Sequence, residues 1–347
     1  MKKKKILILQ NILLHYRKAL YNELSKYYDV TILHSGRITI TDNDEYKEII
    51  YANQKIGPFN IQHGVITEVR SDKYDVIIAM FDLRWLNNII SMYIHRNQTK
   101  FIWWGGWLTN NKLADWVRLF LMRKQYNSIL YTQFFKENFI ESGIDKNKLF
   151  VANNTFDVEN REKLYNYPIK NTILFVGSLD KRKENNILIE AFKNIITRIP
   201  PDITLVLVGE GKEEHRLMEL VESFKLHNKV IFAGRVTDNK NLIKYYEKAI
   251  VAVSFGQAGL SVLQSFGYGI PFITKKNAIS GGEKTNIKHN YNGLFCDDQL
   301  DSLEKTLIRI CNDIEYSRTL GKNAFNYYNE FCTIKQMSQG FIDAIES

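Results

Sequence analysis

A glycine followed by three cations stands where a buried strand is expected to end. The segment Phe175–Lys183 begins with an apolar run and continues with Gly177, Lys181, Arg182 and Lys183. Cations at the carboxyl end of a strand can neutralise a diphosphate leaving group without a metal ion. A charge run is also typical of a solvated surface, and the sequence leaves both interpretations open.

A second glycine-containing turn precedes a predicted helix further along the chain. A buried strand ends at Ser254, the turn Phe255–Gly259 follows, and a helix is expected to begin near Leu260. Glycine lets backbone N–H groups approach a ligand closely, and the first turn of a helix attracts anions. The pattern predicts a phosphate-binding turn, although ordinary strand–helix turns also favour glycine. The amide of Gln264, on this helix, could bond the hydroxyl pair of a ribose or could face solvent.

Aromatic and basic residues gather in the first half of the chain. Trp103, Trp104 and Trp107 lie beside glycines at the end of another predicted strand. Their rings could stack on a sugar that receives a transferred group, or they could seat a lipid-linked acceptor of this kind at a membrane interface. The next helix, expected around Leu113–Gln125, mixes apolar and basic residues, which is typical either of a membrane-surface contact or of core packing. His15 could act as a base on the acceptor side, although a single histidine is more often structural.

Asp42 and Asp44 have the acid–any–acid spacing that metal-dependent sugar transferases use. In those enzymes the acids follow a buried strand and hold a divalent ion on the diphosphate. Here the pair stands in a polar stretch that is typical of a surface loop, so no metal and no other cofactor is expected. The three separated cysteines make neither a metal pattern nor a disulfide framework and favour a reducing compartment. The net charge of +9 could attract phosphate-bearing substrates, anionic lipid or nucleic acid.

Apolar runs alternate with amphipathic segments, and 347 residues are enough for two domains. The first half has predicted strands at Ile6–Leu9, Val30–His34, Val76–Met80, Phe101–Trp104 and Ser128–Tyr131. The second half has them at Thr172–Val176, Ile203–Val208, Val230–Ala233, Val251–Ser254, Phe272–Thr274 and Gly293–Phe295. This alternation is typical of parallel α/β sheets, whose ligands bind at the carboxyl ends of the strands. We expect two Rossmann-like, doubly wound domains facing each other across a cleft: residues 1–157, a linker at 158–170, a second domain at 171–330, and a helix at 331–347 that packs back toward the first domain.

The second half resembles the donor domain of family 4 glycosyltransferases. The resemblance covers roughly residues 171–330 and rests on segments in matching order and spacing: Val176–Leu179, Leu188–Phe192, Leu207–Gly211, Val230–Val236, Gly259–Gln264, Gly269–Pro271 and Asn292–Phe295. The first half resembles the acceptor domain of the same family more weakly, through His15–Arg17 and Asn153–Thr155. The resemblance implies the GT-B fold, a nucleotide-diphosphate sugar as donor, and retention of anomeric configuration.

The resemblance also implies which residues hold each substrate. Lys183 matches the phosphate-binding lysine of the family, and Arg182 and Glu283 join it as catalytic candidates, with an exposed loop acid as the alternative for Glu283. The residues expected to bind the donor are Gly177, Ser178, Gly209, Arg235, Val236, Gly256, Gly259, Leu260, Ser261 and Gln264. Those expected to bind the acceptor are His15, Tyr16, Arg17, Trp104, Gly106 and Trp107.

Several positions depart from the family pattern. The family usually carries two glutamates eight positions apart, and this chain has Gly256 and Gln264 there. Gln264 could still hold the ribose, whereas Gly256 has no side chain with which to touch the sugar. Ser178 stands where relatives have a basic residue, and Arg182 could replace it. The loop after the fourth strand of the first domain lacks the histidine that many relatives carry.

These patterns predict a hexosyltransferase-type enzyme that moves a sugar from a nucleotide-diphosphate donor to a glycan or lipid-linked glycan acceptor in cell-surface polysaccharide synthesis. The missing glutamates favour an alternative, a catalytically degenerate sugar-nucleotide or glycan-binding partner of an active transferase. Nucleic-acid binding would rest on charge alone, and we expect no nucleic-acid partner. The lysine-rich start leads into an interrupted apolar run rather than a signal peptide. We therefore expect a cytoplasmic protein, with peripheral contact to anionic lipid at the inner face of the cell membrane as a further option.

Overall fold

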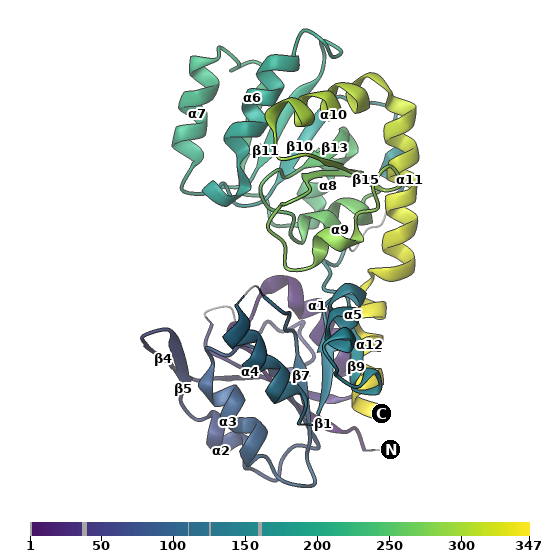
Figure 1. Ribbon diagram of the computed structural model, residues 1–347. Coiled ribbons are helices and arrows are strands. Elements are labelled where there is room, and N and C mark those ends of the chain that lie inside the picture. Colours follow the sequence, from purple (N-terminus) through teal and green to yellow (C-terminus); the bar gives the residue numbers. More distant parts are fainter. Residues whose placement is uncertain (1, 37–39, 110, 125, 159–161) are drawn as a thin grey trace. The chain divides into compact units, whose positions relative to one another are not determined.

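The computed structural model describes residues 2–36, 40–109, 111–124, 126–158 and 162–347. The chain divides into two compact units (Figure 1). One unit takes in Met1–Asn154 together with Ile334–Ser347, and the other takes in Thr155–Thr333.

The first unit contains a seven-stranded sheet in the order β3-β2-β1-β6-β7-β8-β9, and its neighbouring strands are parallel. The strands are β1 (Lys5–Leu9), β2 (Asp29–His34), β3 (Lys47–Ile50), β6 (Val76–Met80), β7 (Lys100–Trp104), β8 (Asn127–Leu130) and β9 (Leu149–Val151). An antiparallel hairpin is formed separately by β4 (Asn53–Ile56) and β5 (Phe59–Gln62). All five strands predicted for this half are present. The hairpin and β3 escaped prediction because they are short and carry no strong apolar run, and β9 escaped it because it is only three residues long.

Both faces of this sheet are packed. The helices are η1 (His15–Arg17), α1 (Lys18–Ser25), α2 (Val65–Val69), α3 (Leu86–Ile94), α4 (Lys112–Met122), α5 (Gln133–Glu141), η2 (Lys146–Lys148) and α12 (Ile334–Glu346). Successive residues of a strand point to opposite faces. Ile6 and Ile8 accordingly join one buried cluster, and Leu7 and Leu9 join another. A strand buried on both faces reads as a continuous apolar run, which is why β1 was visible in the sequence.

The last helix of the chain belongs to the first unit. The ring of Phe341 on α12 meets the ring of Trp104 edge-on at 4.9 Å. The Asn127 side chain donates a hydrogen bond to the Ala344 carbonyl oxygen at 2.9 Å. The chain therefore returns to its first unit after completing the second.

Residues 158–170, predicted as a linker, are grouped with the second unit. Residues 159–161 lie outside the described part of the chain. Of the remainder, Leu164 and Tyr165 in η3 (Leu164–Asn166) are buried. This part of the segment is therefore packed against the second unit.

The second unit contains a six-stranded parallel sheet in the order β12-β11-β10-β13-β14-β15. The strands are β10 (Thr172–Val176), β11 (Thr204–Val208), β12 (Val230–Gly234), β13 (Ala249–Val253), β14 (Phe272–Lys275) and β15 (Gly293–Cys296). The strand order reverses between β10 and β13. In a doubly wound sheet the loops leaving the carboxyl ends at such a reversal part from each other, and ligands bind in the crevice between them.

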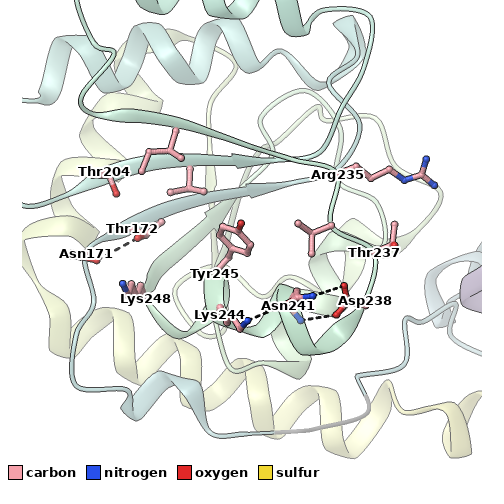
Figure 2. A pocket seen from close by; sticks show the side chains of 13 residues that line it. Asn171, Thr172, Thr204, Arg235, Thr237, Asp238, Asn241, Lys244, Tyr245 and Lys248 are labelled. Atoms are coloured by element: carbon pink, nitrogen blue, oxygen red, sulfur yellow. Dashed lines mark hydrogen bonds between the residues drawn. The ribbon is translucent and has the colours of Figure 1, made fainter.

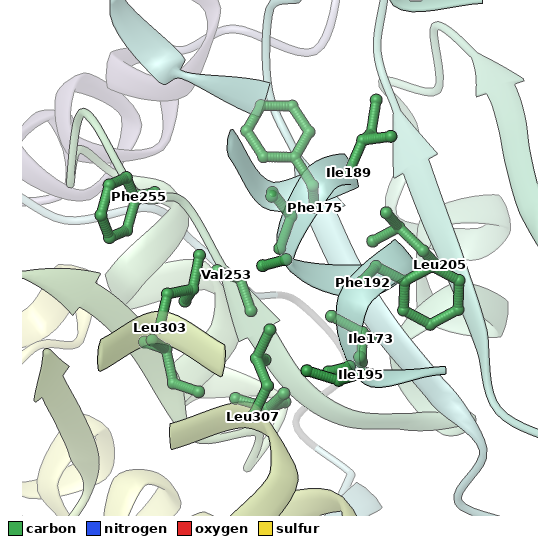
Figure 3. Close-up of a cluster of buried hydrophobic side chains, with 14 of the residues drawn as sticks. Ile173, Phe175, Ile189, Phe192, Ile195, Leu205, Val253, Phe255, Leu303 and Leu307 are labelled. Carbon is green, nitrogen blue, oxygen red and sulfur yellow. The ribbon is translucent and has the colours of Figure 1, made fainter. Parts of the chain in front are cut away.

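Helices cover the second sheet and hold the ends of the loops that follow its strands. They are η4 (Lys181–Lys183), α6 (Asn185–Ile195), α7 (Glu214–Ser223), α8 (Asn239–Glu247), α9 (Ser261–Gly267), η5 (Glu283–Asn286), α10 (Leu300–Asn312) and α11 (Ile314–Phe331). Figure 3 shows Phe192 and Ile195 of α6 packed with Ile173 of β10 and Leu307 of α10 in one apolar core. This core anchors both the strand before Lys183 and the helix after it.

Candidate active site

The loop that carries Lys183 leaves the carboxyl end of β10, at the reversal of strand order. The Gly177 N–H donates to the Val208 carbonyl oxygen at 2.9 Å, and the Leu179 N–H donates to that of Glu210 at 3.0 Å. The loops that follow β10 and β11 are thereby tied together. Gly209 packs so tightly that a Cβ there would overlap the Gly177 carbonyl oxygen, so only glycine fits without moving the backbone.

The Lys183 side chain is buried, with 8% of the residue exposed. A Cβ built at Gly177 would lie 3.9 Å from the Lys183 Nζ, so the ammonium group is next to this glycine. Burial, assisted by the nearby Arg182 charge, lowers the pKa of Lys183 to about 8, while the carboxylates of Asp180 and Glu283 oppose this shift. No hydrogen bond or ion pair joins Nζ to another described residue, so a bound anion could supply its partner.

The turn after β13 is attached directly to the Lys183 segment. The Gly256 N–H donates to the Lys183 carbonyl oxygen at 3.1 Å. A Cβ built at Gly259 would meet nothing within 4 Å, so open space lies beside this glycine. Leu260 is the N-cap of α9, and the Ser261 hydroxyl that follows is buried without a hydrogen-bond partner in the described structure. The turn has room for a ligand, as the predicted phosphate-binding turn requires.

Glu283 reaches the same region from the loop after β14. The Ala258 N–H donates a hydrogen bond to the Ile279 carbonyl oxygen, and the Ile279 N–H donates one to the Gly256 carbonyl oxygen, both at 2.9 Å. Glu283 is 8% exposed and accepts a hydrogen bond from the Gly281 N–H at 3.0 Å. Its influence on the pKa of Lys183 places the two side chains in one electrostatic neighbourhood. Glu283 is therefore a buried acid rather than an exposed loop acid.

Two other residues predicted at the site have local partners. Arg182 is exposed, and its guanidinium lies 3.5 Å from Asp180. The Ser178 hydroxyl donates to the same carboxylate at 2.7 Å. Arg182 could turn toward a ligand only by leaving a surface ion pair, which costs little.

Gln264 is neither solvent-facing nor free. It is 6% exposed, and its Oε1 accepts a hydrogen bond from the Tyr246 hydroxyl at 3.3 Å. A ribose would have to share this buried amide with Tyr246.

A pocket of about 680 Å³ lies between α8 and the strands β10, β11 and β12 (Figure 2). Val236 is among its lining residues, and Figure 2 shows Arg235 at one end and Thr172, Thr204 and Lys248 at the other. Thr172 and Thr204 begin their strands, so most of the pocket extends away from the carboxyl edge. It touches the predicted donor site only at Arg235 and Val236. Arg235 is exposed and pairs with Glu210 at 3.1 Å.

Two residues predicted on the acceptor side, Trp104 and Arg17, are buried in the core of the first unit. Trp104 is 0% exposed and lies in the core, so its ring has no free face for an acceptor sugar. Trp103, which the sequence offered for the same role, is equally buried, on the other face of the sheet. Adjacent residues of a buried strand face opposite layers, and both layers here are filled.

Arg17 is held inside the first unit beside Trp104. Its guanidinium lies 4.2 Å from the Trp104 ring centroid and donates hydrogen bonds to the Tyr131 hydroxyl at 3.0 Å and to Gln10 Oε1 at 3.1 Å. The nearby tyrosine side chains raise the pKa of Arg17 against the opposing effect of its burial. Its contacts are those of a structural cation that joins the ends of β1, β7 and β8.

The other acceptor-side residues lie nearer the surface. Trp107 is 44% exposed and stacks on Phe135 with centroids 6.4 Å apart. His15 is exposed and meets Tyr16 edge-on at 5.9 Å. Gly106 has φ +101°, and a Cβ there would lie 2.5 Å from a ring carbon of Phe81, so this position requires glycine.

Helix α4 exposes an apolar face. Leu113, Trp116 and Phe120 are 73%, 61% and 44% exposed and stand three and four residues apart, on one side of the helix. Trp116 stacks on Phe120, and the Lys124 ammonium lies 5.1 Å from the Phe120 ring centroid. Only the far side of α4 is buried, through Leu121 and Met122.

One acid of the polar loop, Asp44, has structural partners. Asp44 accepts hydrogen bonds from the Lys18 ammonium at 2.6 Å and from the Asn22 amide at 3.1 Å. Within the described residues there is no cluster of three or more histidine, cysteine or acidic side chains suited to hold a metal ion. The helices described are also all too short or too polar to cross a membrane.

The sequence of the second unit matches a known protein family. Residues 157–327 match the family described as glycosyl transferases group 1. This segment is a group 1 glycosyl transferase domain. The resemblance inferred from Val176–Leu179 through Asn292–Phe295 is thereby confirmed.

Two curated bacterial relatives align with about half of the chain. One is the N-acetyl-alpha-D-glucosaminyl L-malate synthase of Bacillus anthracis, 25% identical over 169 residues, or 48% of this chain and 43% of that protein. The other is a Campylobacter jejuni alpha-1,4-N-acetyl-D-galactosaminyltransferase named for a diphospho-undecaprenol-linked glycan, 31% identical over 167 residues, or 47% of this chain and 44% of that protein. The chain therefore spans less than half the length of these relatives.

A solved structure matches the chain from end to end. Anabaena HepE in complex with UDP covers 99% of both chains with a TM-score of 0.75 and 17% identity. At this identity the likeness shows the fold alone. The expectation of two Rossmann-like domains of the GT-B type is confirmed.

One charged pair at the site was not predicted from the sequence. Glu184, directly after Lys183, pairs with Lys275 at the end of β14 with an N–O distance of 2.7 Å. The two residues stand 91 positions apart. The sequence signal was a glutamate next to Lys183, the lysine predicted to bind phosphate, and it looked like part of a charge run.

Proposed function

We propose that this group 1 glycosyl transferase is a hexosyltransferase-type enzyme that moves a sugar from a nucleotide-diphosphate donor to a glycan or lipid-linked glycan acceptor. The observation that supports this most is the Lys183 ammonium, which is buried at the reversal of strand order and has no protein hydrogen-bond partner among the described residues. A buried cation of this kind is costly unless an anion joins it. A diphosphate has the charge to do so.

In the proposed reaction, the bond between the anomeric carbon and the diphosphate oxygen breaks, and the oxygen of the acceptor hydroxyl takes its place. Negative charge grows on the leaving oxygen as this bond lengthens. The Lys183 ammonium and the backbone N–H groups of Gly259–Ser261 would stabilise that charge, with Arg182 at the outer edge. Glu283 favours the protonated form of Lys183 through its own charge. We propose that these groups act in place of a metal ion and that the anomeric configuration is retained.

The identity of both substrates is proposed at the level of chemical class. HepE, which shares the fold, was solved with UDP, and the Campylobacter jejuni relative is named for a diphospho-undecaprenol-linked acceptor. A uridine-diphosphate sugar and a lipid-linked glycan of a cell-surface polysaccharide are accordingly the first substrates to test.

The α4 face also supports a lipid-linked acceptor. We propose that Leu113, Trp116 and Phe120 enter the interfacial layer of an anionic membrane while Lys112 and Lys124 approach its headgroups. Each basic residue near an anionic surface contributes about 1 kcal/mol, and a basic amphipathic helix lies naturally in such an interface. This arrangement would place the protein at the inner face of the cell membrane.

Donor turnover tests the proposed activity. The purified chain is incubated with UDP-glucose, UDP-galactose, UDP-N-acetylglucosamine, UDP-N-acetylgalactosamine or GDP-mannose, with and without a lipid-linked glycan, and release of the nucleotide is measured. We expect slow hydrolysis of one donor and faster release with acceptor, insensitive to EDTA. NMR of the product would establish the anomeric configuration.

A second candidate is favoured by Gly256 and by the bond between Gln264 and Tyr246. A non-catalytic partner of an active transferase would bind a nucleotide sugar without needing a carboxylate at either position. Donor binding without any nucleotide release, even with acceptor present, would support this role and reject the enzyme.

Vesicle binding tests the membrane contact. We expect the chain to co-sediment with phosphatidylglycerol vesicles more than with phosphatidylcholine vesicles. The variant Leu113→Ser/Trp116→Ser should lower the bound fraction at least about threefold, because the apolar insertion is lost. Met218→Ser, which changes an exposed apolar side chain on α7, is the matched control. Equal binding by both variants would contradict a role for α4.

A further inference from the structure

The space that a side chain at position 256 would use is already filled. A Cβ built at Gly256 would overlap the Arg182 carbonyl oxygen and lie 2.8 and 2.9 Å from Cγ and Cδ of Glu184. The carboxyl group of Glu184 therefore lies where residue 256 would extend its own side chain. The glycine at 256 makes room for a carboxylate that comes from a different loop.

Glu184 is held firmly in this place. Both of its carboxylate oxygens accept hydrogen bonds from the Lys275 ammonium, at 2.7 and 2.8 Å. Lys275 is itself positioned by Phe255, whose ring centroid lies 5.1 Å from Nζ. The side chains of Glu184 and Lys275 keep 31% and 15% of their surface exposed. A carboxylate has about four lone-pair sites, so one ammonium partner leaves capacity for a ligand.

The backbone does not explain a glutamate at position 184. Its φ is +55°, in the left-handed region, where glycine is more comfortable than any residue with a Cβ. Only two other non-glycine residues in the described part of the chain, Lys225 and Asn290, have a positive φ. The reason for a glutamate at position 184 therefore lies in its carboxylate and not in its backbone conformation.

The pair stands beside the proposed diphosphate site. Glu184 follows Lys183 directly, and the Gly256 N–H is bonded to the Lys183 carbonyl oxygen. Phe255 and Gly256 lead into the open turn at Gly259, and Lys275 ends β14, next to β13 in the sheet. A ligand whose diphosphate lies against Lys183 and this turn would carry its next chemical group into the neighbourhood of Glu184.

We infer that Glu184 and Lys275 recognise the sugar of the donor, with the Glu184 carboxylate accepting hydrogen bonds from sugar hydroxyl groups and Lys275 holding the carboxylate in position. This inference rests on the proposed transferase function and adds the residue that distinguishes a nucleotide sugar from the free nucleotide. Hydroxyl groups are the complementary ligand because an ionised carboxylate can only accept hydrogen bonds.

The test compares two affinities for each variant. Isothermal titration measures the Kd of the nucleotide sugar that the wild-type chain binds among the five named above, and the Kd of the matching free diphosphate, UDP or GDP. Glu184→Gln should weaken binding of the nucleotide sugar about tenfold, as expected for loss of a hydrogen bond to a charged group. Its affinity for the free diphosphate should stay within about twofold, because Lys183 is untouched.

Two further variants separate recognition from a merely structural ion pair. Lys275→Gln breaks the same pair but keeps the carboxylate, so it should reduce sugar discrimination less than Glu184→Gln does. Glu184→Gly removes the carboxylate and relieves the positive φ, so it should fold well and still lose the discrimination. Glu190→Gln, an exposed glutamate on α6, is the matched control and should leave both affinities unchanged.

The outcomes are distinct. Equal losses from Glu184→Gln and Lys275→Gln, or equal losses for sugar nucleotide and free diphosphate, would assign Glu184 a structural role and overturn the inference. A wild-type chain that binds none of the five donors would instead reject the proposed function itself.

Discussion

In both sheets the strand order reverses at one point, but different side chains occupy the carboxyl edge at the two points. At the edge of the second sheet, open space lies beside Gly259, and the buried cation Lys183 lies next to Gly177. At the edge of the first sheet, the buried cation is Arg17, and Trp104, Tyr131 and Gln10 surround it. A doubly wound sheet thus provides a place for a ligand, and the residues that fill that place decide whether it stays open. Glycine keeps the second edge accessible, and aromatic side chains close the part of the first edge around Arg17.

The largest effect is expected when aromatic bulk is removed from the carboxyl edge of the first sheet. Trp104→Ala should lower the free energy of unfolding by about 3–5 kcal/mol, because it leaves a cavity and uncovers Arg17. Trp107→Ala, three positions away and 44% exposed, should cost less than about 1 kcal/mol and is the matched control. Urea unfolding followed by tryptophan fluorescence and circular dichroism measures both. Similar costs for the two variants would mean that the first edge is not a packed core.

At the carboxyl edge of the second sheet, the Lys183 ammonium should affect the transfer rate rather than the free energy of unfolding. Lys183→Met preserves the packed stem and should lower the transfer rate at least about a hundredfold, as loss of an electrostatic stabiliser does. The melting temperature should not fall, because the ammonium has no protein partner to lose within the described residues. Lys181→Met, on the exposed neighbour, should change the rate less than about threefold. Unchanged transfer by Lys183→Met would remove this lysine from the mechanism.

The pH dependence of donor binding tests the role of Lys183 further. Its pKa is about 8 because burial and the nearby Arg182 disfavour the charged form. The protonated fraction therefore falls as pH rises from about 7 to about 9, and with it the attraction for a diphosphate, whose own charge is already constant above about pH 7. We expect the affinity for UDP or GDP to weaken about tenfold over this range, measured by isothermal titration. Lys183→Met should show a flat profile, and an equally steep decline in that variant would assign the effect to another group.

The smallest expected effect concerns Arg182. Its side chain is 58% exposed and already paired with Asp180. A screened surface cation contributes little, so Arg182→Gln should reduce the rate only about two- to fivefold. Raising the salt concentration should shrink this difference further. A loss as large as that of Lys183→Met would show that Arg182 enters the site when the donor binds.

The strands and the glycine-rich loops could be predicted because their signals are local. Runs such as Ile6–Leu9 and Thr172–Val176 are apolar throughout, since each strand is buried on both faces. Gly177 and Gly209 could be singled out because they follow such strands directly, and Lys183 because it ends a run of three cations after β10. Trp104 was misplaced for a related reason: a tryptophan at a strand end looks the same in sequence whether its ring faces a ligand or the helix α12, which lies more than 200 residues later.

Two doubly wound domains, most of their strands and the resemblance of the second domain to glycosyltransferases could be predicted from the sequence, because strand burial and loop motifs depend on neighbouring residues. Only the tertiary structure decided that Arg17 and Trp104 are core residues, that Gln264 is engaged by Tyr246, and that Glu184 fills the space beside Gly256. Each of these depends on which distant segments meet across a sheet. Contacts of that kind depend on strand order and packing, and they cannot be predicted from a pattern of neighbouring residues.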